Sequence, residues 1–298
     1  MESIQQIKNR ISSIASTRQI TQSMHLVSSS KIVKSRNKLV ANQDFFTQAN
    51  NLIEAVRSSP DIQSHPYIVG FDAKDAPKRD AVVIVLSSDR GLCGGFNVSV
   101  CRESFLLVKK LKDVRVITVG VKGREYFKRR RSDCIAKSFI GVSENPFYED
   151  AQEIASLVLD WYNKGEVSEI YLVYTKFVNM LSQTPDVKKL LPLDPYQPEE
   201  HVKKDKTENK MRTLVRLEPD DTTLLINTVP FYLNSFIFRA MLEASVCEQS
   251  ARVAGMDSAV KNADEMMESL TLKYNQARQS AITQEVIEII SGAKAVQK

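Results

Sequence analysis

The stretch that decides the fold spans residues 230–290 and reads PFYLNSFIFRAMLEASVCEQSARVAGMDSAVKNADEMMESLTLKYNQARQSAITQEVIEII. Proline occurs only at its first position, so the residues predict one helix about sixty residues long, far beyond the usual globular length. Pro230 suits the first turn of a helix, and Gly292 suits the left-handed residue that ends one. Such a helix would be roughly 90 Å long, several times the diameter of a small domain.

This stretch carries an apolar seam that advances in steps of three and four residues. Small side chains prevail in its first half, and larger ones follow a shift of phase near Gly255. A globular core cannot cover a helix of that length, so we expect the seam to pack on another helix. Its members are Ile237, Ala240, Ala244, Cys247, Ala251 and Ala254, then Met256, Val260, Ala263, Met267, Leu270, Tyr274, Ala277 and Ala281.

Residues 3–57 form a second long helical stretch, which Ser58, Ser59 and Pro60 end. Apolar seams mark only its two ends, and a polar, basic middle over residues 18–38 separates them. A helix of this kind is expected to touch different partners along its length. The seam residues are Ile4, Ile7, Ile11 and Ile14 at one end, and Phe46, Ala49, Ile53 and Val56 at the other.

The middle of the chain changes period. Short apolar runs at 81–86, 114–119 and 170–177 alternate with helical patterns at 97–111, 122–130 and 147–163, which predicts an α/β sheet. The polar segment 60–79 is interpreted as a linker, the proline-rich segment 183–210 as an exposed excursion, and residues 214–217 as a candidate return to the sheet edge. Residues 221–229 fit either a strand or a short helix, with the preceding turn at Asp220 as a helix start.

We therefore expect an α/β fold with three parts. These are an N-terminal helix over residues 1–59, an α/β domain over 78–218 and a C-terminal helix over 221–298.

Charge and composition exclude several classes. The net charge of +5 lies in the N-terminal segment, where a solvated face or an acidic protein partner explains it better than nucleic acid does. No run of eighteen apolar residues or secretory signal is seen, although the acid-poor N-terminus leaves a transit peptide to consider. Four scattered cysteines are typical of reduced thiols in the cytosol, and three scattered histidines argue against a metal site.

The turn SSDRGLCGGFN, at residues 87–97, lies between a strand and a helix, where doubly wound folds bind phosphates. It lacks GxGxxG, GKS/T and an acidic residue for a ribose, so no cofactor is expected. Gly91, Gly94 and Gly95 permit a tight turn, and Asp89 and Arg90 are candidates to present charge to a partner. No nucleophile elbow, paired carboxylates or HExxH occurs, which makes the α/β domain a scaffold with no catalytic site.

Three segments resemble signatures of the gamma subunit of the F-type ATP synthase, bacterial type. They are IKNRISSIASTRQITQSMHLVSSSK at residues 7–31, the SSDRGLCGGFN turn, and the pair FRAMLEASVCEQSARVAGMDSAVKNADEM and YNQARQSAITQEVIEIISGA at residues 238–266 and 274–293. Since the three occur in order from end to end, coincidence is a poor explanation.

The resemblance implies a Rossmann-like α/β domain beside an antiparallel coiled coil of the two terminal helices. It implies a rotor shaft, the central stalk that couples proton flow to ATP synthesis or hydrolysis. The upper coil would turn inside the ring of alpha and beta subunits, and the α/β domain would sit against the epsilon subunit and the c-ring, peripherally at the cytoplasmic face of the cell membrane. The basic middle of the first helical stretch, with Lys31, Lys34, Arg36 and Lys38, would form a band at the waist of the shaft that can face acidic loops of beta subunits.

The resemblance also implies residue roles. Arg278 and Gln279 match the positions that catch a loop of one beta subunit, and the coupling positions beside them are Thr283 and Glu285. Met24 and Arg252 match lower-coil positions that affect coupling, and the foot turn comprises Asp89, Arg90 and Gly91. The family often has lysine near Met24 where this chain has Gln22 and His25.

Two other classes compete with this interpretation. A basic coiled-coil adaptor or nucleic-acid-binding protein would explain the N-terminal charge but not the acidic C-terminal arm. A nucleotide-binding enzyme would need phosphate ligands that the turn at residues 87–97 lacks.

Overall fold

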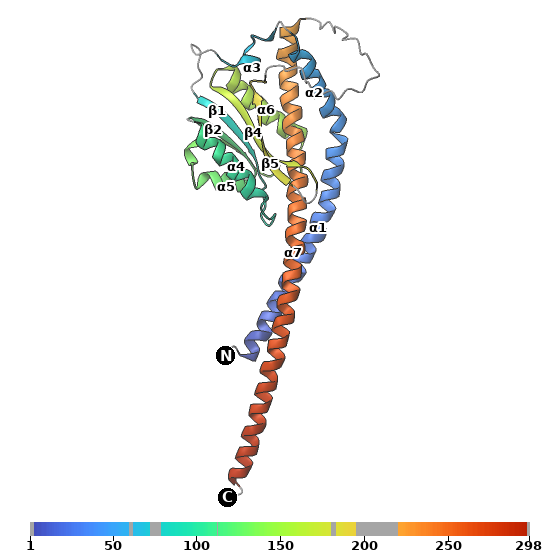
Figure 1. Ribbon diagram of the computed structural model, residues 1–298, viewed down its shortest axis with the longest axis vertical. Coiled ribbons are helices and arrows are strands. Elements are labelled where there is room, and N and C mark those ends of the chain that lie inside the picture. The colour runs from blue at the N-terminus through green and yellow to red at the C-terminus, as the bar shows by residue number, and fades with distance from the viewer. Residues whose placement is uncertain are drawn as a thin grey trace, which may run out of the picture. The chain divides into compact units, whose positions relative to one another are not determined.

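Figure 1 shows the computed structural model of the chain, which describes residues 3–59, 62–71, 79–111, 113–179, 183–194 and 220–296. The chain divides into two compact units. The helical unit joins Met1–Ser30 to Arg252–Lys298, and the sheet unit is Lys31–Ala251. Each unit is described by itself below.

The sheet unit contains a five-stranded sheet in the order β3-β2-β1-β4-β5. The first four strands are parallel, and β5 pairs antiparallel with β4 at the edge. Parallel strands covered on both faces read as continuous apolar runs, as residues 81–86 do. The strands are β1 Arg79–Leu86, β2 Val114–Val119, β3 Ile135–Phe139, β4 Val167–Phe177 and β5 Gln183–Leu191.

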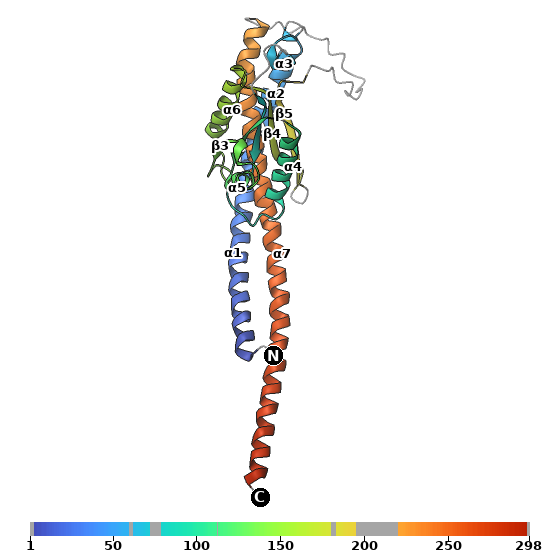
Figure 2. The ribbon, with the colours of Figure 1, turned by 90° about the vertical axis from the view of Figure 1, so that its left-hand side faces the viewer.

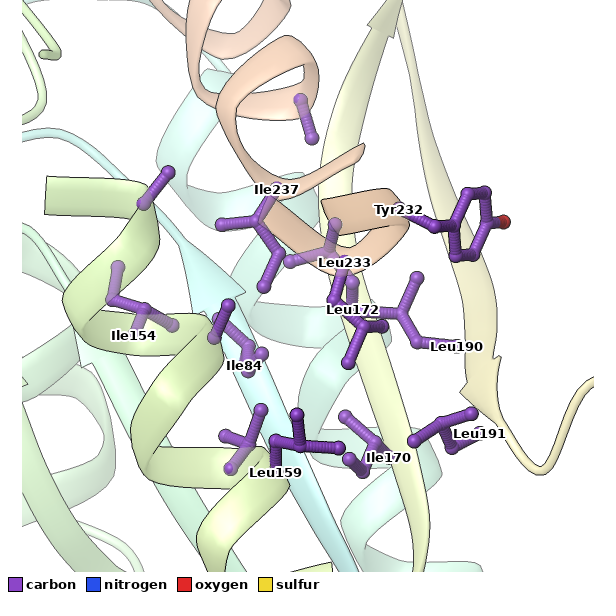
Figure 3. Packing of buried hydrophobic residues seen from close by; sticks show 14 of the residues in the cluster. Ile84, Ile154, Leu159, Ile170, Leu172, Leu190, Leu191, Tyr232, Leu233 and Ile237 are labelled. Carbon is purple, nitrogen blue, oxygen red and sulfur yellow. The ribbon is translucent and has the colours of Figure 1, made fainter. Parts of the chain in front are cut away.

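Helices cover both faces of this sheet, and β1 supplies the side chains of both cores in alternation. Val83 and Val85 are buried with residues of α4 and α5, whereas Ile84 on the other face is buried with residues of α6 and α7. Figure 3 shows this second core, in which Ile154 of α6 and Ile237 of α7 lie over Ile84. The covering helices are α4 Phe96–Lys110, α5 Val121–Lys128, α6 Tyr148–Asn163 and the sheet-unit part of α7 Asp221–Val296, and a 3-10 turn, Ser132–Cys134, precedes β3.

The expected strands and helices of the α/β domain are present, within three residues at either end. Two strands were missed. The expectation of an exposed excursion is wrong for residues 183–191, which form β5, and β3 gave no apolar run because its Ala136 and Lys137 are exposed. Pro185 fits β5 because an edge strand has one unpaired side, where a missing N–H costs little. Residues 195–210 and 214–217 lie outside the described ranges.

The expected linker before β1 contains structure as well. Pro66–Val69 forms the short helix α3, with Tyr67 and Ile68 buried in the main core. The Leu193 N–H donates to the Tyr67 carbonyl at 2.7 Å, so this segment is fastened to the end of β5.

A titrating cap begins α3 and makes its stability depend on pH. The Tyr67 N–H donates to His65 Nδ1 at 3.2 Å, and burial lowers the pKa of His65 below its ordinary value. The His65 imidazole therefore binds a proton more readily in the unfolded chain than in the folded one. Its contribution to the stability of the folded state is complete above about pH 6.5, the pKa in the unfolded chain, and is lost as the pH falls from there through the lower pKa of the folded state. Between pH 7.5 and 5.5, we expect amide exchange of residues 67–70, corrected for intrinsic rates, to rise in the wild type. His65→Asn, which caps without titrating, should remove that rise; an equal rise in both proteins would contradict the prediction.

The start and the end of the C-terminal helix were misplaced. Helix α7 begins at Asp221, so residues 221–229 are helical and Pro230 lies inside the helix. The Asp220 carboxylate accepts from the Thr223 N–H at 2.9 Å, which caps the helix at the turn that the sequence indicated. An interior proline is costly, but the buried Leu225 and Val229 anchor the preceding turns in the core. Gly292 does not end the helix, because α7 continues to Val296.

The N-terminal helical stretch is divided in two. Helix α1 spans Ile4–Ala41 and α2 spans Gln43–Arg57, with a break at Asn42. The Ala49, Ile53 and Val56 seam of α2 is buried, as expected, and Arg57 is its last residue.

The small-residue seam of α7 faces the sheet, so the expectation that the seam packs on another helix is wrong over this half. Ala240, Ala244 and Cys247 lie in the core shared with β1 and β4, and the Cys247 thiol points to the Thr175 carbonyl at 3.6 Å. Small side chains let the helix approach the sheet closely. A different row of α7 meets α1 in the sheet unit, where Leu242 and Val246 pack with Leu39.

The helical unit is an antiparallel pair of helices, as predicted. Arg18 pairs with Asp264, and His25 acts electrostatically on Asp257, so α1 numbers fall as α7 numbers rise. Every member of the second-half seam, from Met256 to Ala281, is buried or half-buried, while most positions between them are exposed. On α1 the row of covered residues that begins with Ile4 and Ile14 continues through polar residues, namely the half-buried Arg18 and Thr21 and the buried Ser28. A search for apolar periodicity could not find this part of the row, because its residues are polar.

Candidate functional site

The end of α7 holds the four residues assigned to partner contacts. Arg278, Gln279, Thr283 and Glu285 are all exposed, whereas the neighbouring seam residues Tyr274, Ala277 and Ala281 are half-buried. Residues four apart lie on one face of a helix, as do residues seven apart, so Gln279 adjoins Thr283 and Arg278 lines up with Glu285. The Thr283 hydroxyl donates to the Gln279 carbonyl at 2.9 Å. The four residues thus form two exposed polar rows, neither of which belongs to the half-buried seam.

An apolar end follows these polar rows. Ile289 is 71% exposed and Ile290 51%, and Ile282, Val286 and Ile287 are exposed to similar degrees. Within the helical unit, α7 runs past the N-terminal end of α1, which leaves these residues uncovered in the single chain (Figure 2). A run of exposed aliphatic side chains is typical of a surface that contacts another molecule. We call residues 278–290 the tip.

Met24 and Arg252, the residues assigned to the lower coil, also belong to the helical unit. Met24 is half-buried on α1, and Arg252 is buried on α7, being 4% exposed. They lie on different helices from one another and many turns away from Arg278 along α7. The structure thus divides the sequence-predicted residues of this unit into two separate groups.

The foot turn lies at the carboxyl edge of the sheet and uses Asp89 internally. One Asp89 carboxylate oxygen accepts from the Val121 N–H at 3.1 Å, and the other accepts from the Ser143 hydroxyl at 2.8 Å. Arg90 is exposed and Gly91 half-exposed. Of the two charges assigned to a partner, only the Arg90 guanidinium is presented outward, while the Asp89 carboxylate braces the sheet unit.

Helix α7 occupies the crevice where a doubly wound sheet would bind a phosphate. The cavity beside the turn measures only about 10 Å³ and is lined by Ser87 and Phe96 on the sheet side and by Met241, Ala244 and Glu248 of α7. The polar groups of the turn also satisfy one another, since Asn97 accepts from the Ser88 N–H at 2.9 Å. This crevice has no room for a nucleotide.

Other chemistry finds little support in the described part of the chain. No group of three His, Cys, Asp or Glu side chains suited to a metal occurs among the residues that the structure describes. Burial raises the pKa of the Cys101 thiol to about 12 and raises the pKa of Cys134 and Cys247, so these thiols stay protonated and unreactive at neutral pH. Within the same described ranges, no helix is long and apolar enough to cross a membrane.

One functional feature escaped the sequence reasoning. Lys31 pairs with Glu144, and the Lys38 ammonium donates to Asn145 Oδ1 at 2.6 Å, so two members of the expected basic waist face the chain's own β3–α6 loop. We define the β3–α6 loop as residues 140–147. A local sequence pattern cannot predict contacts between residues that lie more than a hundred positions apart in the chain.

Comparison with known proteins bears on the whole chain. A family model described as ATP synthase matches residues 3–296. The ATP synthase gamma chain of Alkaliphilus metalliredigens is 38% identical over 294 residues, covering 99% of this chain and 99% of that protein. The gamma chain of Lachnoclostridium phytofermentans is 41% identical over 298 residues, covering 99% and 100% respectively. A gamma chain of Acetobacterium woodii described as sodium ion specific is 34% identical over 305 residues, covering 99% of each.

Solved structures share the fold. A chain of the Euglena gracilis mitochondrial ATP synthase, from an OSCP/F1/c-ring assembly in rotational state 3, matches with a TM-score of 0.66 and 17% identity over 98% of this chain and 94% of that one. A chain from the central stalk and c-ring of the Tetrahymena thermophila enzyme matches with a TM-score of 0.60 and 22% identity, over 80% and 99%. Long terminal helices beside an α/β sheet are thus the common architecture.

Proposed function

The chain belongs to the ATP synthase gamma chain family, and from this premise we propose that it is the central rotor stalk of an ATP synthase. The observation that carries the proposal is the tip, where α7 continues beyond α1 and exposes isoleucines beside its polar rows. A solvated helix end has no reason to expose this much aliphatic surface. An apolar sleeve formed by alpha and beta subunits would cover it without fixing its angle, because apolar contacts are non-directional.

Rotation would act on the catalytic sites through the asymmetry of the shaft. The polar rows at Arg278, Gln279, Thr283 and Glu285 occupy one side of α7, so a surrounding ring of subunits meets them at one angle at a time. A contact that favours one conformation of a catalytic subunit shifts the population of that subunit alone. Each turn of the stalk would then change the nucleotide affinity of the sites in sequence.

The sheet unit would form the foot of the stalk, against the epsilon subunit and the c-ring. Exposed Arg90 is available to such a partner, and Met24 and Arg252 would adjust coupling on the coil. In this proposal the chain lies peripherally at the cytoplasmic face of the membrane. Protons are our expected coupling ion, and the similarity to a gamma chain described as sodium ion specific makes sodium the alternative to test.

Neither competing class gains support. A nucleotide-binding enzyme would need an open crevice where α7 packs, and the chain itself is proposed to have no catalytic site. A nucleic-acid-binding protein is not favoured, because two of the four basic residues of the segment 31–38, Lys31 and Lys38, contact the β3–α6 loop. Membership of a gamma chain family explains both helices and the sheet together.

The test is reconstitution with alpha and beta subunits of a similar gamma-containing enzyme. We expect the full-length chain to enter a stable complex that hydrolyses ATP, and a bead attached to its sheet unit to rotate during hydrolysis. Alone, the chain should show neither ATP turnover nor micromolar ATP binding, because its crevice is filled. Assembly without rotation, or turnover by the isolated chain, would overturn the proposal.

A further inference from the structure

The β3–α6 loop lies at the carboxyl edge of the sheet, away from the chain connections to the long helices. Helix α3 leads into β1 from the opposite edge, and β5 ends there too, since Leu193 bonds to Tyr67 at 2.7 Å. At the carboxyl edge, the described residues of the sheet contact α1 and α7 through side chains and backbone polar groups, such as Glu144 with Lys31 and with Ser245. A force that moves the sheet sideways against the helices is resisted there by non-covalent contacts.

On its sheet side, the loop is joined to the turns after β1 and β2 through one carboxylate. Ser143 donates to Asp89 from its hydroxyl at 2.8 Å and from its N–H at 3.3 Å, and its hydroxyl accepts from the Asp89 N–H at 3.0 Å. The same carboxylate accepts from Val121, which follows β2. Hydrogen bonds to a charged acceptor are shorter and stronger than neutral ones, so Asp89 holds three loops in one arrangement.

On its helix side, the next residues of the loop reach both long helices. The Glu144 carboxylate pairs with Lys31 of α1, and the Ser245 hydroxyl of α7 donates to the Glu144 carbonyl at 3.1 Å. The hydroxyls of Ser245 and Ser35 lie 3.1 Å apart, which links α7 to α1 at the same level. Asn145 accepts from Lys38, whose ammonium also lies 5.2 Å from the centre of the Phe147 ring.

These contacts differ in kind from the packing around them. Apolar contacts between α7 and the sheet resist separation but allow sliding, because they are non-directional. Hydrogen bonds weaken steeply when their angle or length changes, so they resist sliding. The loop concentrates directional contacts at the edge where, among the described residues, no chain segment leads from the sheet directly into a long helix.

We propose that the β3–α6 loop is the fastening through which turning force passes between the β-sheet and the segments of both long helices that lie in the sheet unit, with Asp89 and Glu144 as its positioning residues. The inference rests on the proposed rotor function and adds the path of the force inside the chain. If these contacts are weakened, part of each rotation should twist the sheet relative to the long helices. Fewer ions should then be moved across the membrane for each ATP hydrolysed.

The experiment reverses charges in the complete ATP synthase reconstituted in vesicles. Glu144→Lys and Lys31→Glu each place like charges together, and we expect each to lower ion pumping per ATP hydrolysed by about twofold or more, because repulsion replaces the attraction of a partly exposed pair. The double variant K31E/E144K restores opposite charges and should restore the ratio. Hydrolysis by the detergent-released alpha, beta and gamma complex, which carries no load, should stay near the wild-type rate in all three.

Matched controls separate a specific loss from a general charge effect. Lys128→Glu changes an exposed residue of α5 and Glu149→Lys an exposed residue of α6, and both should leave the pumping ratio unchanged. If the single variants assemble poorly, Ser143→Ala keeps the charges and should lower the ratio by removing one donor and acceptor of the Asp89 network.

Three results would overturn the inference. They are a wild-type ratio in E144K, no recovery in the double variant, and increased amide exchange at residues 140–147 with an unchanged ratio in S143A, which would make the loop merely structural. Failure of the proposed function itself is seen separately, because the wild-type chain would then not support rotation at all.

Discussion

Replacing Gly120 by alanine is expected to destabilise the folded chain by about 3 kcal/mol or more. Gly120 follows β2 with φ +93°, a conformation that a side chain strains. A Cβ atom there would lie 2.5 Å from the Ser87 carbonyl oxygen and 2.8 Å from the carbonyl carbons of Ser87 and Ser88. The backbone cannot swing aside, because the Gly120 N–H donates to Phe139 at 2.8 Å and thereby joins β2 to β3.

The measurement is the denaturant midpoint of the full-length chain, with Gly141→Ala as the matched control. Gly141 has φ +83° but no atom within 4 Å of the position that an alanine methyl group would occupy, so its alanine variant carries the backbone strain without the collision. We expect Gly141→Ala to cost about 1–3 kcal/mol and Gly120→Ala clearly more. Equal midpoints for the two variants would show that the carboxyl edge of the sheet can open, contrary to the packing described here.

Replacing Arg278 and Gln279 together by alanine is expected to lower the ATPase rate of the reconstituted complex about tenfold or more, since each ~1.4 kcal/mol added to a limiting barrier slows it tenfold. A guanidinium can fork onto a carboxylate, and a glutamine amide both donates and accepts, so the pair suits a grip on a polar loop at one rotor angle. Neither side chain lies on the buried seam, and alanine favours helix, so the coil should stay folded.

The control for this variant is K273A/Q276A, which removes a cation and a glutamine from exposed positions one turn earlier on α7. We expect this control to keep at least about half of the wild-type rate, because solvated surface residues contribute little. Both variants must enter the complex in normal amount. A wild-type ATPase rate in R278A/Q279A would show that these two residues are only solvated surface residues. Equal losses of rate in both variants would show that the contact is not specific to Arg278 and Gln279 but extends along the end of α7.

The sequence alone determined the class of fold, because the evidence for each element is local. A seam in steps of three and four predicts a long packed helix wherever it occurs, and Val114 to Val119 is a buried strand by composition alone. The roles of Arg278 and Gln279 came from the resemblance to the gamma subunit family and not from periodicity, because exposed polar residues beside an apolar seam occur on most surface helices. Element ends were less certain, as the helical residues before Pro230 show, because buried neighbours override a proline's preference.

Only the tertiary structure decided what each surface faces. The Ala240 to Cys247 seam is suited equally to a helix or to a sheet, and the sheet covers it because α7 crosses the crevice that the strands leave open. Strand β5 has no apolar run because an edge strand is covered only partly. The pair of Lys31 and Glu144 joins residues 113 positions apart, and no periodicity encodes such a contact. Electrostatic pairing acts through space, after the chain has folded, and therefore the fastening of sheet to shaft could be recognised only in three dimensions.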